Sequence, residues 1–290
     1  MSCKKTIAIA APAVALLVGI LAAAAFLAGC GIGIGPTQEF TVNEGLTGAA
    51  VTDVRVSMGA GKLSVQPGGS GLVSGVIRYN VAAWKPQVTR TDSAVTVKQG
   101  TTKGLSGAAS NVVNDWQLKL GGAPVRLAVT AGAYEGTYEL GGLSLQGLSI
   151  KDGASKTKVS FSSPNPSRMD SLTYETGASS VSLTGLADAN FKNMSFRGGA
   201  GTFAFDFSGQ LRSDASVSIS AGVGSVQITV PAGTAAKVVV KGTLTNVSRQ
   251  GTWTVAGKDH STQAAGGKSP GKMLTITVNM DVGNLTLITS

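Results

Sequence analysis

Side chains that could carry acid–base or metal chemistry are scarce in this sequence. The single histidine, His260, follows Asp259 in a polar, glycine-rich stretch, and an imidazole beside a carboxylate can act as a base or a metal ligand. No cysteine and no cluster of carboxylates accompanies it. We therefore interpret His260 as an exposed loop residue, and we expect no metal site and no cofactor.

Aspartates are the other candidates, because polysaccharide hydrolysis needs two carboxylates that flank the scissile bond. Asp206 could approach an acidic residue on a neighbouring repeat, but it lies between Phe205 and Phe207, where strand alternation turns it outward. No aspartates show a calcium-binding spacing. A polysaccharide-active enzyme is therefore the weakest alternative, and we expect no catalytic residue. The aspartates considered are Asp152, Asp206, Asp214 and Asp281.

Three tryptophans could stack on a sugar or on a partner protein. Trp116 and Leu118 alternate with polar neighbours, as buried strand residues do. Trp84 and Trp253 lie near interruptions of the repeat described below, so they are the better candidates for exposed contacts. Packing in the core or at an edge is nevertheless the favoured role for all three.

The two cysteines lie near the N-terminus. Lys4 and Lys5 precede an uncharged, mostly apolar run over residues 7–26, which is typical of a secretion signal. The run is followed by Leu27, Ala28, Gly29 and Cys30, which resemble the lipobox of bacterial lipoproteins. The resemblance implies that residues 1–29 are removed and that Cys30 carries acyl chains; two or more chains give stable membrane anchoring.

The alternative for the first segment is an uncleaved transmembrane helix, since about twenty apolar residues can span a bilayer. Residues 30–45 are predicted to be the lipidated cysteine and a flexible tether, because Gly31–Pro36 is rich in glycine. We expect the body on the extracytoplasmic face of the cell membrane or the outer membrane. Residue 31 is glycine, not aspartate, which favours the outer membrane if the organism has two membranes.

Composition favours an all-β body. Only 13% of residues are charged, glycine occurs 40 times, and no thiol remains beyond Cys30, which excludes internal disulfides and cysteine-based metal sites. The formal charge is +9, or +7 without Lys4 and Lys5, so an anionic wall polymer is a possible partner. The cations are scattered, and nucleic acid is not an expected partner. The nearest approach to a cluster is Lys151, Lys156 and Lys158.

A repeated unit organises the rest of the chain: a strand, a small-residue corner, and a second strand. Relative to the first corner residue, apolar residues recur at positions −5, −3, +4, +6 and +8. In seven units 30 of these 35 positions are apolar, against about 15 expected from the 42% average, which indicates strands with one buried face. The corner positions are Gly59, Gly132, Gly153, Gly177, Gly199, Gly222 and Asp281.

Successive corners between Gly132 and Gly222 are 21 to 24 residues apart, and a period of this length indicates a solenoid-like stack. We expect the corner glycines to permit either a positive φ or a close backbone approach. They do not form a phosphate-binding loop, because each corner leads into a second strand instead of a helix. Residues 46–124 are predicted to form an N-terminal β subdomain, and residues 125–290 the repeat domain.

The stack is predicted to be interrupted twice, over residues 68–124 and 231–272. The first interruption carries strand-like runs at Leu72–Tyr79 and Ala94–Lys98, and the second carries one at Lys237–Lys241. The polar, glycine-rich segment Gly257–Gly271 is predicted to be a mobile surface loop.

The segments VRVSMGAGKLSV, MSFRGGAGTFAFDFSG, VSISAGVGSVQITVPAG and LTITVNMDVGNLTL resemble the toast-rack domains, a β-helical group related to bacterial adhesins. The group includes the regulator of a Lia-type envelope stress system. The resemblance implies a right-handed parallel β-helix and transfers no catalytic residue. We expect a non-catalytic, adhesin-like binding or scaffolding protein of the cell envelope. The alternative is an accessory modulator of an envelope stress sensor, which requires one envelope protein as its partner.

Overall fold

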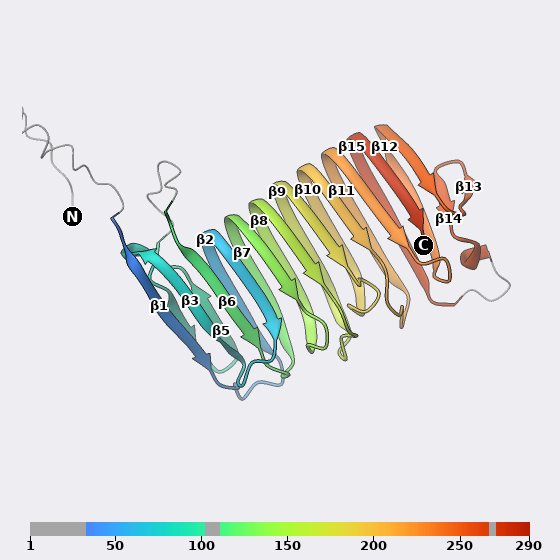
Figure 1. Ribbon diagram of the computed structural model, residues 1–290. Coiled ribbons are helices and arrows are strands. Elements are labelled where there is room, and N and C mark those ends of the chain that lie inside the picture. Colours follow the sequence, from blue (N-terminus) through green and yellow to red (C-terminus); the bar gives the residue numbers. More distant parts are fainter. Residues whose placement is uncertain (1–32, 102–110, 267–270) are drawn as a thin grey trace, which may run out of the picture.

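The computed structural model describes residues 33–101, 111–266 and 271–290, and these residues form a nearly all-β stack (Figure 1). The predicted secretion signal, with the lipobox residues Leu27, Ala28 and Gly29, and Cys30 lie outside the described residues. The strands are β1 (Ile34–Glu44), β2 (Thr52–Pro67), β3 (Val73–Val81), β4 (Gln87–Arg90), β5 (Ala94–Lys98), β6 (Asn114–Leu120), β7 (Val125–Glu139), β8 (Leu145–Ser160), β9 (Met169–Thr184), β10 (Phe191–Asp206), β11 (Ala215–Val230), β12 (Ala235–Gln250), β13 (Thr254–Ala256), β14 (Asp259–Ser261) and β15 (Met273–Thr289), with short 3-10 helices η1 (Ala82–Trp84) and η2 (Gln263–Gly266).

Each long strand is bent at its middle, and we call such a bent strand a rung. Parallel pairing to the next rung continues through the bend: in β10 and β11 it runs from Asn193↔Ser216 to Asp206↔Thr229, interrupted only at the corner. The halves before the corners form one sheet face, here called the entry face, and the halves after the corners form the exit face. The predicted β-solenoid-like stack is therefore confirmed.

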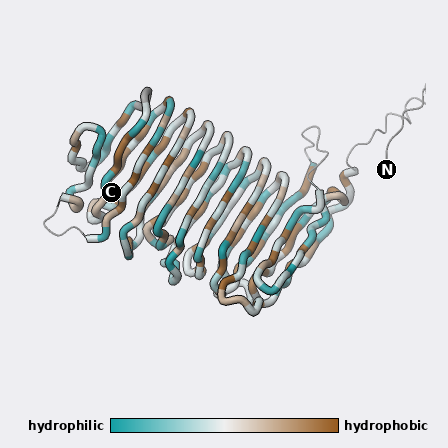
Figure 2. Tube along the Cα trace, turned by 180° about the vertical axis from the view of Figure 1, so that it is seen from behind, coloured by the Kyte–Doolittle hydropathy of each residue, from teal (hydrophilic) through white to brown (hydrophobic). Residues whose placement is uncertain are grey.

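The core lies between the two faces, and apolar residues run from rung to rung as bands (Figure 2). The predicted positions are buried, as Val217, Ile219, Val226, Ile228 and Val230 of β11 show. In the unit of Gly199, four of the five positions are phenylalanines and the fifth is Met194. Phe196 packs edge-on against Phe203 and Phe205, with ring centroids 4.9 Å apart in both pairs. The core of the described residues forms one cluster from β1 to β15.

The corner glycines stack directly above one another. A Cβ atom on Gly199 would lie 2.7 Å from the carbonyl oxygen of Gly177, and one on Gly222 would lie 2.6 Å from that of Gly199. Close approach, not a positive φ, is therefore the constraint at these positions. A positive φ occurs two residues later in several rungs, as in Gly201 (φ 148°) and Gly224 (φ 142°).

The rung beyond β2 is built from two separate strands, because β5 pairs with the first half of β2 and β6 pairs with the second half. Side-chain amides replace the missing corner. The Gly59 amide donates to Oε1 of Gln99 at 2.9 Å, and Asn114 Nδ2 donates to the Ala60 carbonyl at 2.5 Å. Gln99 and Asn114 are buried and bonded to each other at 3.0 Å. The two side-chain amides thus provide hydrogen-bond partners for the backbone amide of Gly59 and the backbone carbonyl of Ala60 at the corner of β2.

The prediction that residues 30–45 form a flexible tether is wrong for β1, which pairs antiparallel with β3 from Gln38↔Tyr79 to Glu44↔Val73. Val42 is buried and Phe40 packs against the core, so two inward side chains hold the segment. The predicted division after residue 124 does not separate two cores, since β2 and β7 pair from Thr52↔Val125 to Val65↔Tyr138.

The second predicted interruption contains a full rung, β12. It does not follow β11 in space: β15 pairs with β11 on one side and with β12 on the other, so the strand order is β11-β15-β12. The predicted mobile loop Gly257–Gly271 is also partly ordered, because β14 pairs with the first half of β12 at Val238↔His260. Among the residues that the structure describes, no helix has the length and hydropathy to cross a membrane.

Candidate functional site

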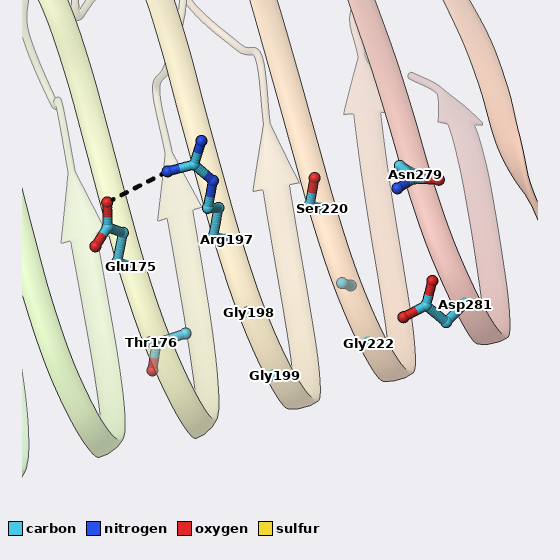
Figure 3. A pocket seen from close by; sticks show the side chains of 10 residues that line it. Glu175, Thr176, Arg197, Gly198, Gly199, Ser220, Gly222, Asn279 and Asp281 are labelled. Carbon is cyan, nitrogen blue, oxygen red and sulfur yellow. Dashed lines mark ion pairs between the residues drawn. The ribbon is translucent and has the colours of Figure 1, made fainter.

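A shallow trough of about 440 Å³ crosses the corners of four adjacent rungs, β9, β10, β11 and β15 (Figure 3). Its floor is low because the corners carry Gly198, Gly199 and Gly222, whose missing side chains leave backbone at the surface. Longer polar side chains line the trough beside this floor. They are Glu175 and Thr176 on β9, Arg197 on β10, Ser220 on β11, and Asn279 and Asp281 on β15.

Charge is unevenly distributed along the trough. Glu175 forms ion pairs with two cations, Lys151 at 3.1 Å and Arg197 at 3.5 Å, so the β9 end is an ion-pair network. At the β15 end Asp281 is exposed, and no ion pair to it occurs within the described part of the chain. Exposed ion pairs of this kind contribute little to stability. The trough can therefore offer both a guanidinium and a carboxylate to a polar ligand.

A buried polar network lies beneath the neighbouring corners. Tyr174 donates to Oδ2 of Asp152 at 2.7 Å, and Thr176 donates to Oδ1 of the same carboxylate. The hydroxyls of Tyr134 and Tyr138 lie 3.0 Å apart. Burial raises the pKa of all three tyrosines, and the Asp152 charge adds to this rise. For Tyr138 and Tyr174, repulsion from a neighbouring tyrosinate raises the pKa further, whereas hydrogen bonds partly offset the rise for Tyr134. Asp152 is thus a carboxylate held inside the corner, and its role is structural.

The other three aspartates are not brought together with it. Asp206 accepts from the amide and hydroxyl of Ser208, at 2.9 and 3.0 Å, so it fixes the turn after β10. Asp214 accepts from the Met273 amide at 2.9 Å and thereby ties the start of β15 to β11. In the described ranges no group of three or more His, Cys, Asp or Glu side chains is arranged to hold a metal.

The interpretation of His260 as an exposed loop residue is wrong. It lies in β14 and is 4% exposed. Burial lowers the pKa of its imidazole, repulsion from Arg249 lowers that pKa further, and Asp259 opposes both effects. The backbone ladder between β14 and β12 places the ring against the end of the core, where a chemical role would require access that the side chain lacks.

The tryptophans are packing residues. Trp116 is fully buried, and its Nε1 donates to Oδ1 of Asn114 at 2.7 Å. Trp84, which the sequence left as a candidate for an exposed contact, is 2% exposed. Trp253 is partly buried against the core and donates to the Gln250 carbonyl at 3.3 Å. The favoured packing role is thus the observed one.

The predicted lysine cluster is divided by a corner. Lys151 precedes the β8 corner and pairs with Glu175, whereas Lys156 and Lys158 follow the corner and belong to the exit face. An anionic polymer could therefore not contact all three on one face.

Asn165 is a structural residue that the sequence pattern does not reveal. Its side chain is fully buried in the loop between β8 and β9 and makes four hydrogen bonds, to Leu145 N (3.1 Å), Leu145 O (2.8 Å), Ala189 O (3.1 Å) and Ser167 N (3.0 Å). An asparagine in a Ser/Pro-rich loop gives no sequence signal for this role, because its three partner segments meet only in the folded stack.

Comparison with known proteins identifies related domains. Residues 34–173 match the N-terminal domain of toast_rack, DUF2154. A candidate cell adhesion protein from Clostridium sporogenes ATCC 15579 has a similar structure, with a TM-score of 0.51 and 18% identity over 88% of this chain and 100% of that one. At that identity the likeness concerns the fold alone. No curated protein matches the chain.

Two candidate adhesins are structurally more distant. One from Bacteroides fragilis NCTC 9343 has a TM-score of 0.29 and 13% identity over 87% of this chain and 96% of its own. One from Parabacteroides distasonis ATCC 8503 has a TM-score of 0.36 and 8% identity over 88% of this chain and 98% of its own.

Proposed function

Residues 34–173 match the N-terminal domain of toast_rack, and on that premise we propose that the chain is a toast-rack protein and a non-catalytic, adhesin-like binding or scaffolding module of the bacterial envelope, anchored through acyl chains on Cys30. The observation that supports the proposal most is the shape of the stack: two broad sheet faces with shallow polar hollows over one continuous core. Such a surface suits contact with an extended partner better than enclosure of a small substrate, which usually needs a deep pocket.

Two further observations support a role without catalysis. The aspartates considered as catalytic candidates are hydrogen-bonded separately, Asp152 with Tyr174 and Thr176, and Asp206 with Ser208. The similar fold of the Clostridium sporogenes protein, which is described as a candidate for cell adhesion, agrees with a surface-contact role.

The anchor is tested by Cys30→Ala in the full-length protein. We expect the wild-type protein to partition into the detergent phase of Triton X-114 and to gain the mass of its acyl chains, because two or more chains bind membranes stably. The variant should stay unprocessed and unlipidated by mass spectrometry. Equal processing and equal acyl mass for both proteins would contradict the lipid anchor.

The non-catalytic role is tested separately. Incubation with envelope polysaccharides should release no shorter products. Turnover that is lost in Asp206→Asn, with circular dichroism unchanged, would contradict the proposal and favour a polysaccharide-active enzyme.

A further inference from the structure

A second hollow, of about 470 Å³, lies on the entry face of the same four rungs, β9, β10, β11 and β15. Outward side chains at two positions of each rung line it, and the buried Leu172, Met194 and Val217 lie between them. We call this surface the entry-face hollow. Its outward residues are Ser171, Thr173, Asn193, Ser195, Ser216, Ser218, Thr275 and Thr277.

The entry-face hollow is uncharged in a protein whose formal charge is +9. Seven of its eight outward side chains carry hydroxyls and the eighth carries an amide. The same face is charged on both sides of the hollow: Asp53 pairs with Arg55 at 2.7 Å on β2, and Lys237 of β12 pairs with Asp259 at 2.7 Å. The neutral zone is therefore a local feature and does not extend along the whole face.

Strand pairing arranges these side chains in two straight rows across the rungs. Asn193 pairs with Ser171 and with Ser216, and Ser195 pairs with Thr173 and with Ser218. Thr275 and Thr277 of β15 continue the two rows. Adjacent rungs are about 4.8 Å apart, and the two rows are about 6.6 Å apart along the strands. Each rung therefore repeats the same pair of polar groups at a fixed interval.

None of these eight side chains is engaged in a hydrogen bond or ion pair with another group of the described chain. A hydroxyl can both donate and accept, and an amide offers two donors and an acceptor. The side chains are short, so ordering them on binding costs little rotamer entropy compared with lysine or arginine. The array is thus free and partly preorganised for a polar ligand.

We propose that the entry-face hollow binds a neutral glycan chain that lies across the rungs, so that successive sugars meet successive rungs. This inference deepens the proposed binding role and depends on it. Rows of hydroxyls complement the hydroxyls of a sugar polymer, and the rung spacing is close to the length of one sugar unit in an extended glycan. An anionic polymer would find no cation in the hollow, and a protein partner would find none of the aromatic or arginine anchors that dominate protein interfaces.

The test is titration calorimetry of the full-length protein in detergent with three neutral hexasaccharides, cellohexaose, chitohexaose and xylohexaose, and with an oligomer of polygalacturonic acid. We expect at least one neutral probe to bind and the anionic probe to bind more weakly. Replacing Ser195 and Ser218 with lysine should lower the affinity for the neutral probe at least tenfold, because two long cationic side chains would project into the rows.

The matched control replaces Ser182 and Ser225 with lysine. These serines lie on the exit face, and they match Ser195 and Ser218 in partial and full exposure. This variant should change the affinity less than twofold. If the lysine pair in the hollow lowers the melting temperature, Ser195→Ala with Ser218→Ala replaces it, with an expected loss of about threefold.

Absence of binding to every neutral probe, an equal loss in the hollow and exit-face variants, or a preference for the anionic oligomer would overturn the proposal. Each of these results leaves the Cys30 partition and turnover experiments untouched. Failure of the glycan site is therefore distinguishable from failure of the anchored, non-catalytic role.

Discussion

Glycine sets the closest contacts of the stack, and its effect is clearest at Gly201. The residue has φ 148°, and a Cβ atom there would lie 1.8 Å from the carbonyl oxygen of Ser179 on the neighbouring rung β9. Substitution would therefore meet both backbone strain and a steric clash that no flexible side chain can relieve. The loss of stability would arise at the corner of β10, which is packed between the corners of β9 and β11.

We expect Gly201→Ala to destabilise the protein by about 3 kcal/mol or more. The control is Lys192→Ala, an exposed change on the same rung, which should stay within about 0.5 kcal/mol. Urea unfolding followed by circular dichroism measures both values. Similar unfolding midpoints for the two variants would contradict the role assigned to the corner.

His260 gives stability a pH dependence with a defined sign. Burial holds its pKa below the ordinary 6.5, so the unfolded chain takes up a proton near that pH while the folded chain does not. Stability should therefore fall as pH decreases from 7.5 to 5.5 and should level off below the folded pKa. His260→Gln should flatten the dependence in urea titrations over this range; an unchanged slope would count against this assignment.

Glu139 makes the stability of the fold depend on pH in a lower range than His260 does. Burial alone would raise its pKa, but hydrogen bonds from Ser160, from the Gly141 amide, and from the amide and hydroxyl of Ser162 outweigh burial and lower it. Its stabilising effect is present above its ordinary pKa of 4.5 and is lost as pH falls below that value. His260 and Glu139 therefore change the stability of the fold in separate pH ranges.

At the scale of the element, local periodicity predicted the rungs whose inward rows are fully apolar, such as β10 and β11. It failed for β12, where Arg249 and Gly251 stand at positions that are apolar in other rungs. Because β12 lies near the end of the stack, the second half of its inward row has only one neighbouring rung to face. An end rung therefore needs fewer apolar residues and gives a weaker signal.

The order β11-β15-β12 could not be predicted for a different reason. Each rung has a similar apolar pattern, so local sequence does not say which of two later rungs pairs with β11. The choice of partner depends on the packing and hydrogen bonding summed over the whole length of the paired strands. In the structure β15 pairs with β11 from Ala215↔Leu274 to Val230↔Thr289. The outward Ser and Thr residues of the entry-face hollow give no sequence signal, because their alignment into rows depends on the register between rungs.

Proline substitution distinguishes an interior rung from an edge strand. Thr286→Pro would remove a ladder donor from β15, which is paired on both sides, and should cost about 3 kcal/mol or more. Val255→Pro in β13, a three-residue edge strand, should cost about 1 kcal/mol or less. Thermal melting of the two variants makes the comparison, and equal losses would argue against the interior position of β15.

At the scale of the molecule, one core of packed side chains carries the stability, since no thiol other than Cys30 lies beyond the predicted signal. The two ends of the sheet are finished differently. At one end β1 contains Pro36 and an irregular register between Ile34 and Gln38. At the other end β14 and β13 cover the first half of β12. Such features discourage edge-to-edge aggregation.

The interior position of β15 has a consequence for the order in which the chain can assemble. Ribosomes make β12 before β15, so for a time β11 and β12 each present a vacant ladder to the same missing strand. Assembly from the N-terminal side can proceed rung by rung as far as β11, but the last part must wait until β15 emerges and slots between its neighbours. A chain cut short before residue 273 would keep both ladders open, and unpaired strand edges of this kind tend to pair with other chains.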